Sequence, residues 1–412
     1  MSPQPGIATP APLFDPSRHE ALTASDWDEP IARAAIERIV EDSSAAFSAD
    51  GLWPAHELDE PQTAHTRYAM LYLGAGGVIW ALRRLAHFGW VGEGTARFDA
   101  VVPTLLERNR AVGQTHLEGS ASYLMGDAGL LLLQWQVSHE PAVADRLYAV
   151  VHANLHHAAR EMLWGSPGTL LAALHMAEAT GDARWAEVLE RGARILWEQM
   201  DFDDVLGAWV WHQDLYVETR CFVGAGHGFA GNIYPILRGS GFLPNSLVQA
   251  YTERAFQTLR ALVLSDGVCA NWHAIHDPVG IAGRLPLVQD CHGAPGIVCR
   301  LAGAPKSPDW DDLLAAAGEL TWRAGPLVKG PGLCHGTAGN GYAFLKLWTR
   351  TADPQWLARA RAFAMHAIGQ VEGERRIRGY GRHSLWTGDI GVALYLRSCI
   401  DADSDFPTLD VF

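Results

Sequence analysis

The chain carries two near-identical hexads, CHGAPG at residues 291–296 and CHGTAG at residues 334–339. Each hexad joins a cysteine and a histidine to a Gly-x-x-Gly turn. Thiolate sulfur and imidazole nitrogen are the ligands that zinc prefers in proteins. The hexads therefore predict a zinc site assembled from two turns of the same kind.

The Gly-x-x-Gly element recurs along the whole chain, and an apolar run follows each copy. The seven copies are GAGG (74–77), GDAG (126–129), GSPG (165–168), GFAG (228–231), GAPG (293–296), GTAG (336–339) and GDIG (388–391). Their spacing is irregular but falls in the range of supersecondary repeats. Before each copy the apolar periodicity predicts a more polar amphipathic helix, and the seven ranges are 31–47, 98–112, 144–162, 183–200, 245–264, 309–324 and 354–371.

These alternating helix pairs predict an all-α fold, a seven-fold α/α double toroid with inner and outer rings of seven helices. Glycines allow tight turns, so the amino ends of the apolar inner helices should meet at one central site. We expect residues 1–28 to form an extended lead-in, residues 29–400 a single toroid domain, and residues 401–412 a tail. Residues 267–290 lack helical periodicity and are expected to form a long loop beside the active site.

Composition narrows the class of protein. A formal net charge of −14 disfavours nucleic acid and anionic membranes as general partners. The six cysteines are too sparse for a disulfide-stapled secreted fold. The sequence begins without the basic and apolar regions of a secretory signal, and no apolar run reaches the ~18 residues of a membrane span. We therefore expect a cytoplasmic protein; nothing in the sequence indicates its oligomeric state.

The candidate metal ligands are Cys291, Cys334 and His335. Two sulfurs and one nitrogen suit Zn²⁺, and three protein ligands leave a fourth position for water or substrate, as in catalytic zinc sites. The other four cysteines are interpreted as small buried side chains, and they are Cys221, Cys269, Cys299 and Cys399.

With these motifs, the chain resembles the lanthionine synthetase C-like proteins, from about residue 60 to residue 400. The resemblance implies a seven-fold toroid with central zinc held by the three ligands already named. LVQDCHGAPG (287–296) and KGPGLCHGTAGNGYAFL (329–345) look closer to the stand-alone, glutathione-associated branch than to the peptide cyclases. Lys329 matches a lysine of that branch and is a candidate substrate-binding residue. Leu287 stands where peptide cyclases often carry a catalytic arginine, and Asp290 where the family commonly has tryptophan.

Three further residues are candidates for proton handling. His227 in GAGHGFAG matches the family's active-site histidine, and imidazole can relay a proton near neutral pH; its alternative is a core histidine bonded to the backbone. His292 follows a zinc cysteine and is either a second acid–base group or a partner of the first shell. Asp127 could orient a histidine or bind a substrate amine, or it could simply cap its own helix.

The resemblance implies addition of a thiol to dehydroalanine or dehydrobutyrine residues, which makes a thioether. Three hypotheses remain at this point. The first is intermolecular addition of glutathione or a peptide cysteine to a dehydrated peptide or protein, which Lys329 favours. The second is ring closure on a dedicated precursor peptide, which Leu287 weakens. The third is a non-catalytic binding module in which zinc only ties the toroid together.

Overall fold

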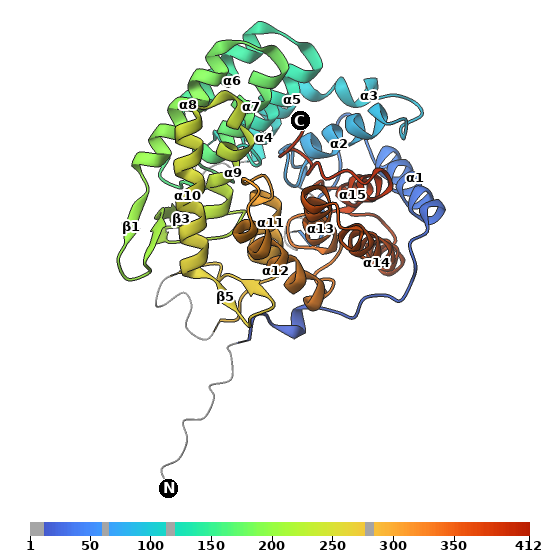
Figure 1. Cartoon of the computed structure of the whole chain (residues 1–412). Helices are drawn as coiled ribbons and strands as arrows, with labels where there is room; N and C mark the ends of the chain where they lie inside the picture. Colours follow the sequence, from blue (N-terminus) through green and yellow to red (C-terminus); the bar gives the residue numbers. More distant parts are fainter. Residues whose placement is uncertain (1–11, 60–65, 113–119, 277–283) are drawn as a thin grey trace.

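The computed structural model describes residues 12–59, 66–112, 120–276 and 284–412, and the predicted double toroid is confirmed there (Figure 1). An inner helix begins at each glycine turn. Each inner helix packs against the next one, and α15 packs against α2, so the ring closes. The inner helices are α2 (Ala75–His87), α5 (Asp127–Ser138), α7 (Ser166–Thr180), α9 (Phe229–Arg238), α11 (Ala294–Leu301), α13 (Thr337–Thr351) and α15 (Asp389–Asp401).

The outer ring surrounds these helices and follows the amphipathic segments of the sequence. In α8, for example, Trp185, Leu189 and Leu196 recur on one face and are fully buried, and α8 packs against α7. The outer helices are α1 (Glu29–Ala45), α4 (Val102–Val112), α6 (Pro141–Ala153), α8 (Ala183–Glu198), α10 (Asn245–Leu262), α12 (Pro308–Ala324) and α14 (Pro354–Arg378). Three short helices complete the described set, namely η1 (Pro16–Arg18), α3 (Ala96–Asp99) and η2 (Ser240–Phe242).

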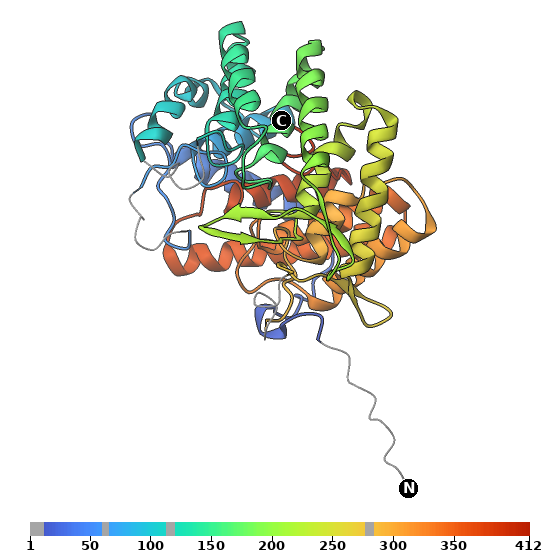
Figure 2. The same cartoon turned by 90° about the vertical axis from the view of Figure 1, so that its left-hand side faces the viewer.

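Three small antiparallel hairpins, which the sequence analysis did not predict, interrupt the helices (Figure 2). Tyr216 and Val217 form the turn of the second hairpin, both with positive φ. The strands are β1 (Asp201–Asp203) with β2 (Ala208–Val210), β3 (Gln213–Leu215) with β4 (Glu218–Arg220), and β5 (Leu264–Ser265) with β6 (Ala270–Asn271). None of the described helices is long and apolar enough to cross a membrane.

The glycine elements owe their spacing to close backbone packing. The first glycine of each element is the N-cap of its inner helix, as Gly74 is for α2. At the second glycine, a Cβ would lie 1.7–2.4 Å from the carbonyl oxygen of the residue six positions earlier. The approach loop therefore folds back onto the first turn of the helix, where only glycine leaves room. The seven carbonyls belong to Leu71, Tyr123, Met162, Ala225, Asp290, Leu333 and Leu385.

Gly77→Ala is expected to destabilise the protein strongly. Its Cβ would lie 2.0 Å from the Leu71 oxygen and 2.8 Å from the Leu385 side chain, so backbone must shift. Overpacking of this kind costs about 1–3 kcal/mol or more. Gly369→Ala is the matched control, because Gly369 lies inside α14 with nothing within 4 Å of its Cβ position. That change should stabilise by roughly 0.5–1 kcal/mol. Urea unfolding of both variants tests the contrast, and equal stabilities would contradict it.

The predicted helix 144–162 was wrong in its second half. α6 ends at Ala153, and Asn154 turns the chain because its side-chain amide donates to the Trp164 carbonyl at 3.1 Å. The residues up to the glycine turn form an irregular approach loop that contains Glu161. In contrast, α14 continues to Arg378, beyond the predicted end at residue 371, and stops at Gly379 with φ +80°.

The two ends of the described chain pack on the toroid in different ways. Residues 12–28 run past α12, where His19 pairs with Leu327 through backbone hydrogen bonds. Residues 402–412 follow α15 into the space enclosed by the inner ring (Figure 1). Phe406 and Leu409 are almost completely buried there. The expected tail 401–412 therefore begins with the last residue of α15 and is otherwise part of the packed interior.

Candidate metal centre and catalytic site

The seven approach loops build one central cavity of about 60 Å³. The residue two positions before each glycine element lines this cavity, so each repeat contributes one residue to the ring. These residues are Tyr72, Leu124, Leu163, Gly226, Cys291, Cys334 and Trp386. The remaining lining residues are Met162, Ala225, His227, Asp290, Arg300 and Leu409.

The predicted ligands come together on two neighbouring turns. One ligand atom from each of Cys291, Cys334 and His335 lies within 4.8 Å of the others. Two backbone hydrogen bonds hold these turns in place. The Cys291 N–H donates to the Cys334 carbonyl at 3.0 Å, and the Cys334 N–H donates to the Trp386 carbonyl at 2.9 Å. Both cysteines are free thiols. Among the described residues, these three form the group of His, Cys, Asp and Glu side chains that could hold a metal ion.

The protonation of the two thiols also fits a metal site. The pKa of Cys334 lies well below its usual value. A hydrogen bond from Cys291 lowers it most, burial opposes this effect, and the nearby His335 lowers it further. The same hydrogen bond, together with burial, raises the pKa of Cys291. One thiolate is therefore favoured before any ion binds, and a cation would allow the second. Two soft sulfurs and one imidazole nitrogen are the donor set of an open zinc site.

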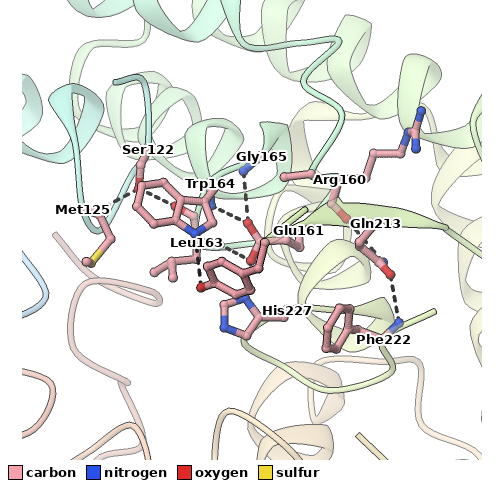
Figure 3. A network of polar contacts seen from close by, with 12 residues as sticks. Ser122, Met125, Arg160, Glu161, Leu163, Trp164, Gly165, Gln213, Phe222 and His227 are labelled. Carbon is pink, nitrogen blue, oxygen red and sulfur yellow. Dashed lines mark hydrogen bonds and ion pairs between the residues drawn. The ribbon is translucent and has the colours of Figure 1, made fainter. Parts of the chain in front are cut away.

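His227 is held by a buried carboxylate that the sequence analysis missed (Figure 3). The His227 Nδ1 lies 2.7 Å from Glu161 Oε2, and the Glu161 side chain has no solvent exposure. The carboxylate also accepts the backbone N–H groups of Leu163 at 2.9 Å, of Trp164, and of Gly165 at 3.3 Å. It is thereby fixed between the approach loop and the start of α7.

This pairing decides the charge state of His227. Burial alone would lower the pKa of the imidazole, but the hydrogen bond and negative charge of Glu161 outweigh it and raise the pKa above its usual value. Because Nδ1 is hydrogen-bonded to the carboxylate, Nε2 is the ring nitrogen that can exchange a proton with a molecule in the cavity, which His227 lines. The arrangement suits a general acid.

His292 lies beside His227 but in a different electrostatic setting. Its ring lies 5.6 Å from the His227 ring and 6.2 Å from that of Phe222. Burial, and then the neighbouring His227, lowers the pKa of His292 to about 3. Its Nδ1 is buried without a hydrogen-bond partner in the described residues. His292 is therefore a neutral ring beside His227, outside the cavity lining.

Tyr72 is a second residue that the sequence analysis missed. Its hydroxyl hydrogen-bonds to the Cys334 sulfur, and its ring stacks on Trp386 at 5.8 Å. Burial and the neighbouring Cys334 raise the pKa of the Tyr72 hydroxyl well above its usual value. Tyr72 therefore stays protonated and can donate to sulfur.

The last two predicted site residues, Asp127 and Lys329, are outside the cavity lining and outside the Cys-Cys-His group. Asp127 is the first residue of α5 and makes an ion pair with Arg110 of α4, and among the described residues no histidine is paired with it. Gly126 is the N-cap residue of α5, so Asp127 is one position inside the helix. Lys329 is exposed on the loop between α12 and α13, and its role stays a prediction.

A larger groove of about 540 Å³ lies beside the site. Arg18, Arg284, His273 and Asp15 line it. Asp15 makes an ion pair with Arg18 at 3.7 Å. Ile275, also in its wall, pairs with Phe222, whose ring stacks on His292. The groove therefore borders the turn that carries Cys291, and it presents two arginines in a chain of negative net charge.

Lys329 is close along the backbone to Arg18, which lines this groove. The N–H of its neighbour Val328 donates to the Arg18 carbonyl at 3.1 Å. Lys329 and the groove arginines are thus candidates for one anion-binding region.

Residues 20–411 match the family described as lanthionine synthetase C-like protein. A relative from Danio rerio, named glutathione S-transferase LANCL1, is 33% identical over 214 residues, which cover 49% of this chain and 47% of the relative. LanC-like protein GCL1 from Arabidopsis thaliana is 39% identical over 137 residues, 31% of either chain. The matched regions thus span about half and about a third of these relatives.

The solved structure of nisin cyclase is also similar. It has a TM-score of 0.56 and 15% identity, and the match covers 90% of this chain and 94% of that one. At this identity the likeness shows the fold alone.

Proposed function

We propose that this chain, which belongs to the lanthionine synthetase C-like family, is a zinc enzyme that adds a thiol to dehydroalanine or dehydrobutyrine residues. The product is a thioether. The observation that carries the proposal is the meeting, in one cavity, of a Cys-Cys-His group and a histidine held by a buried carboxylate. A non-catalytic zinc module would have no use for that second pair.

Zn²⁺ held by Cys291, Cys334 and His335 would lower the pKa of an incoming thiol, so that its reactive thiolate persists near neutral pH. Side chains of the protein carry out the proton transfer that completes the addition. The incoming thiol loses its proton to solvent. The thiolate sulfur forms a bond to the β-carbon, and the electron pair of the broken C=C π bond passes to the α-carbon and its carbonyl. His227 Nε2 then delivers a proton to the α-carbon and is reprotonated from solvent, so the sum is addition of one thiol.

Glu161 supports this transfer from Nδ1. It keeps His227 oriented and favours the cationic ring that can donate. His292 has its pKa lowered to about 3 and is thus a poor donor at neutral pH, which makes His227 the proposed acid. The Tyr72 hydroxyl hydrogen-bonds to Cys334, which lines the same cavity as His227.

The thiol proposed first is glutathione, and a peptide cysteine is the alternative. Glutathione carries two carboxylates, and the groove beside the site offers Arg284 and Arg18, the second of which is paired with Asp15. Lys329 follows Val328, whose N–H donates to the Arg18 carbonyl. The name of the Danio rerio relative also points to glutathione. Leu287 in the groove wall, in place of a cyclase arginine, is consistent with intermolecular addition.

The deciding experiment is incubation of the zinc-loaded protein with glutathione and a dehydrobutyrine peptide, followed by mass spectrometry. A peptide–glutathione adduct that disappears when the metal is removed with a chelator supports the proposal. Zinc bound without any adduct, with glutathione or a cysteine peptide as the thiol, would favour the binding module instead.

Lys329→Met is expected to raise the KM for glutathione about 5–30-fold, as for loss of 1–2 kcal/mol of binding, while kcat changes little. The reason is loss of one cation near the thiol's carboxylates. Steady-state kinetics with glutathione and with uncharged 2-mercaptoethanol measures the effect, which should be absent for the neutral thiol. Lys306→Met, at an exposed lysine between α11 and α12, is the control. An unchanged KM for glutathione would remove Lys329 from the site.

A further inference from the structure

We propose that Leu409 is a specificity-determining residue, because it closes the floor of the cavity beside Cys291 and Cys334 and limits the β-substituent of the electrophile. Leu409 lies on residues 402–412, which follow the last helix of the toroid. It lines the same cavity as both thiols and is 1% exposed. The inference rests on the proposed function. It adds that the site discriminates between dehydroamino acids by the size of the substituent on the β-carbon.

The floor is anchored by Asp410, the residue that follows Leu409. The Tyr234 hydroxyl donates to Asp410 Oδ1 and the Lys346 ammonium to Asp410 Oδ2, each at 2.7 Å. Arg238 donates to the Asp410 carbonyl at 2.8 Å. These partners come from α9 and α13, two inner helices of different repeats. The segment is thus tied across the ring.

The residues before Leu409 are fixed as well. The Tyr123 hydroxyl donates to the Thr408 carbonyl at 2.5 Å. The ring of Phe406 packs 4.7 Å from Tyr342 and 5.6 Å from Trp386, with the Arg300 guanidinium 4.9 Å from its centre. Leu409 therefore has a rigid backbone on both sides, and a tightly packed interior transmits a change of one methylene.

The cavity that Leu409 closes is small and largely apolar. Cys291 and Cys334 line it with Leu409, and so do four apolar side chains, those of Leu124, Met162, Leu163 and Trp386. Its volume of about 60 Å³ is about twice the ~30 Å³ that one water takes up in the liquid, so it admits a small β-substituent and excludes a bulky one. Reacting atoms must come within ~3–3.5 Å, so a β-carbon attacked beside the cysteines would place its own substituent in this space. Dehydroalanine carries hydrogen there and dehydrobutyrine carries a methyl group.

The test uses two substitutions of Leu409, one that fills the cavity and one that enlarges it. Leu409→Phe fills the cavity and is expected to lower kcat/KM for a dehydrobutyrine peptide roughly 10–100-fold relative to the matched dehydroalanine peptide, the range for one methyl-sized group in an apolar pocket. Leu409→Ala enlarges the cavity and should admit a β-ethyl acceptor that the wild type rejects. Leu314→Ala, at a fully buried leucine of α12, controls for general loss of packing. Equal substrate ratios in all four proteins would overturn the inference.

A second readout does not depend on turnover. Enlarged apolar cavities bind xenon, so crystals of Leu409→Ala under xenon pressure should show an atom beside Leu163 and Trp386 that the wild type and Leu314→Ala lack. No xenon there would overturn the floor assignment, whatever the kinetics. If no protein forms an adduct but xenon binds in the Leu409→Ala crystals, the proposed function fails while the floor stands. Melting temperatures of the variants verify that each protein is folded.

Discussion

Replacing Cys334 with alanine is expected to release the metal and reduce thioether formation to background. Cys334 is the thiol favoured as thiolate, and its sulfur also accepts the hydrogen bonds of Cys291 and Tyr72. Its loss leaves Cys291 and His335, and two ligands are too few for a zinc site. Metal content by atomic emission should fall from the predicted one zinc per chain to near zero.

Cys299→Ala is the matched control for this change. Cys299 is also a buried free thiol, in α11 just after the first hexad, but it is outside the metal-binding group. It should keep its zinc and its activity apart from a small packing cost. If Cys334→Ala retained full metal, the assignment of the site would be wrong, even if activity were lost.

The glycine elements made the fold predictable because they mark positions where the backbone leaves no room for a Cβ atom. No other residue type can take the place of glycine there. At Gly77, as at each second glycine, a main-chain oxygen occupies the place of the Cβ. The same geometry recurs at every inner helix, so the repeat is visible in one sequence. The hairpins between α8 and α9 lie outside this repeat, and no comparable signal marked them.

The position of a residue within the repeat also indicated the candidate metal ligands. Cys291 and Cys334 stand two residues before their glycine elements, and so do Tyr72 and Trp386, which line the same cavity. Aligning the seven elements on their first glycine would have identified these aromatic residues. The His335 prediction followed from the second hexad, and the structure places it beside both thiols.

The partner of His227 could not be predicted in this way. Glu161 lay within a segment that the apolar pattern assigned to an outer helix, where a glutamate ordinarily faces solvent. The early end of α6 at Ala153 brings it instead into the approach loop of α7. Asp127 was the sequence candidate for orienting a histidine, but Arg110 of the outer ring holds it. Which carboxylate faces inward depends on where a helix stops, and helix ends are weakly encoded.

His227→Ala is expected to reduce kcat about 10²–10⁴-fold, as for removal of a positioned general acid, while zinc content and circular dichroism stay unchanged. The ring is outside the metal-binding group, so the site should load normally. A variant with its zinc and near-wild-type turnover would make His227 a packing residue, and His292 would then be the next candidate acid.

Glu161→Gln provides the sharper test, because it keeps the shape and removes the charge. The carboxylate raises the pKa of His227, so its loss must lower that pKa. The cationic, proton-donating ring is present below its pKa and lost as pH rises through it. The falling limb of kcat against pH should therefore move to lower pH in the variant, with kcat at neutral pH reduced by about 10-fold or more.

The control for this test is Glu178→Gln, since Glu178 lies 3.8 Å from His175 on α7, outside the cavity lining. It should leave the pH profile in place. A Glu161→Gln profile that coincides with the wild type, at equal KM, would show that Glu161 only holds the backbone N–H groups before α7. A shifted limb with unchanged zinc content would instead identify the carboxylate as the group that keeps His227 charged for proton delivery.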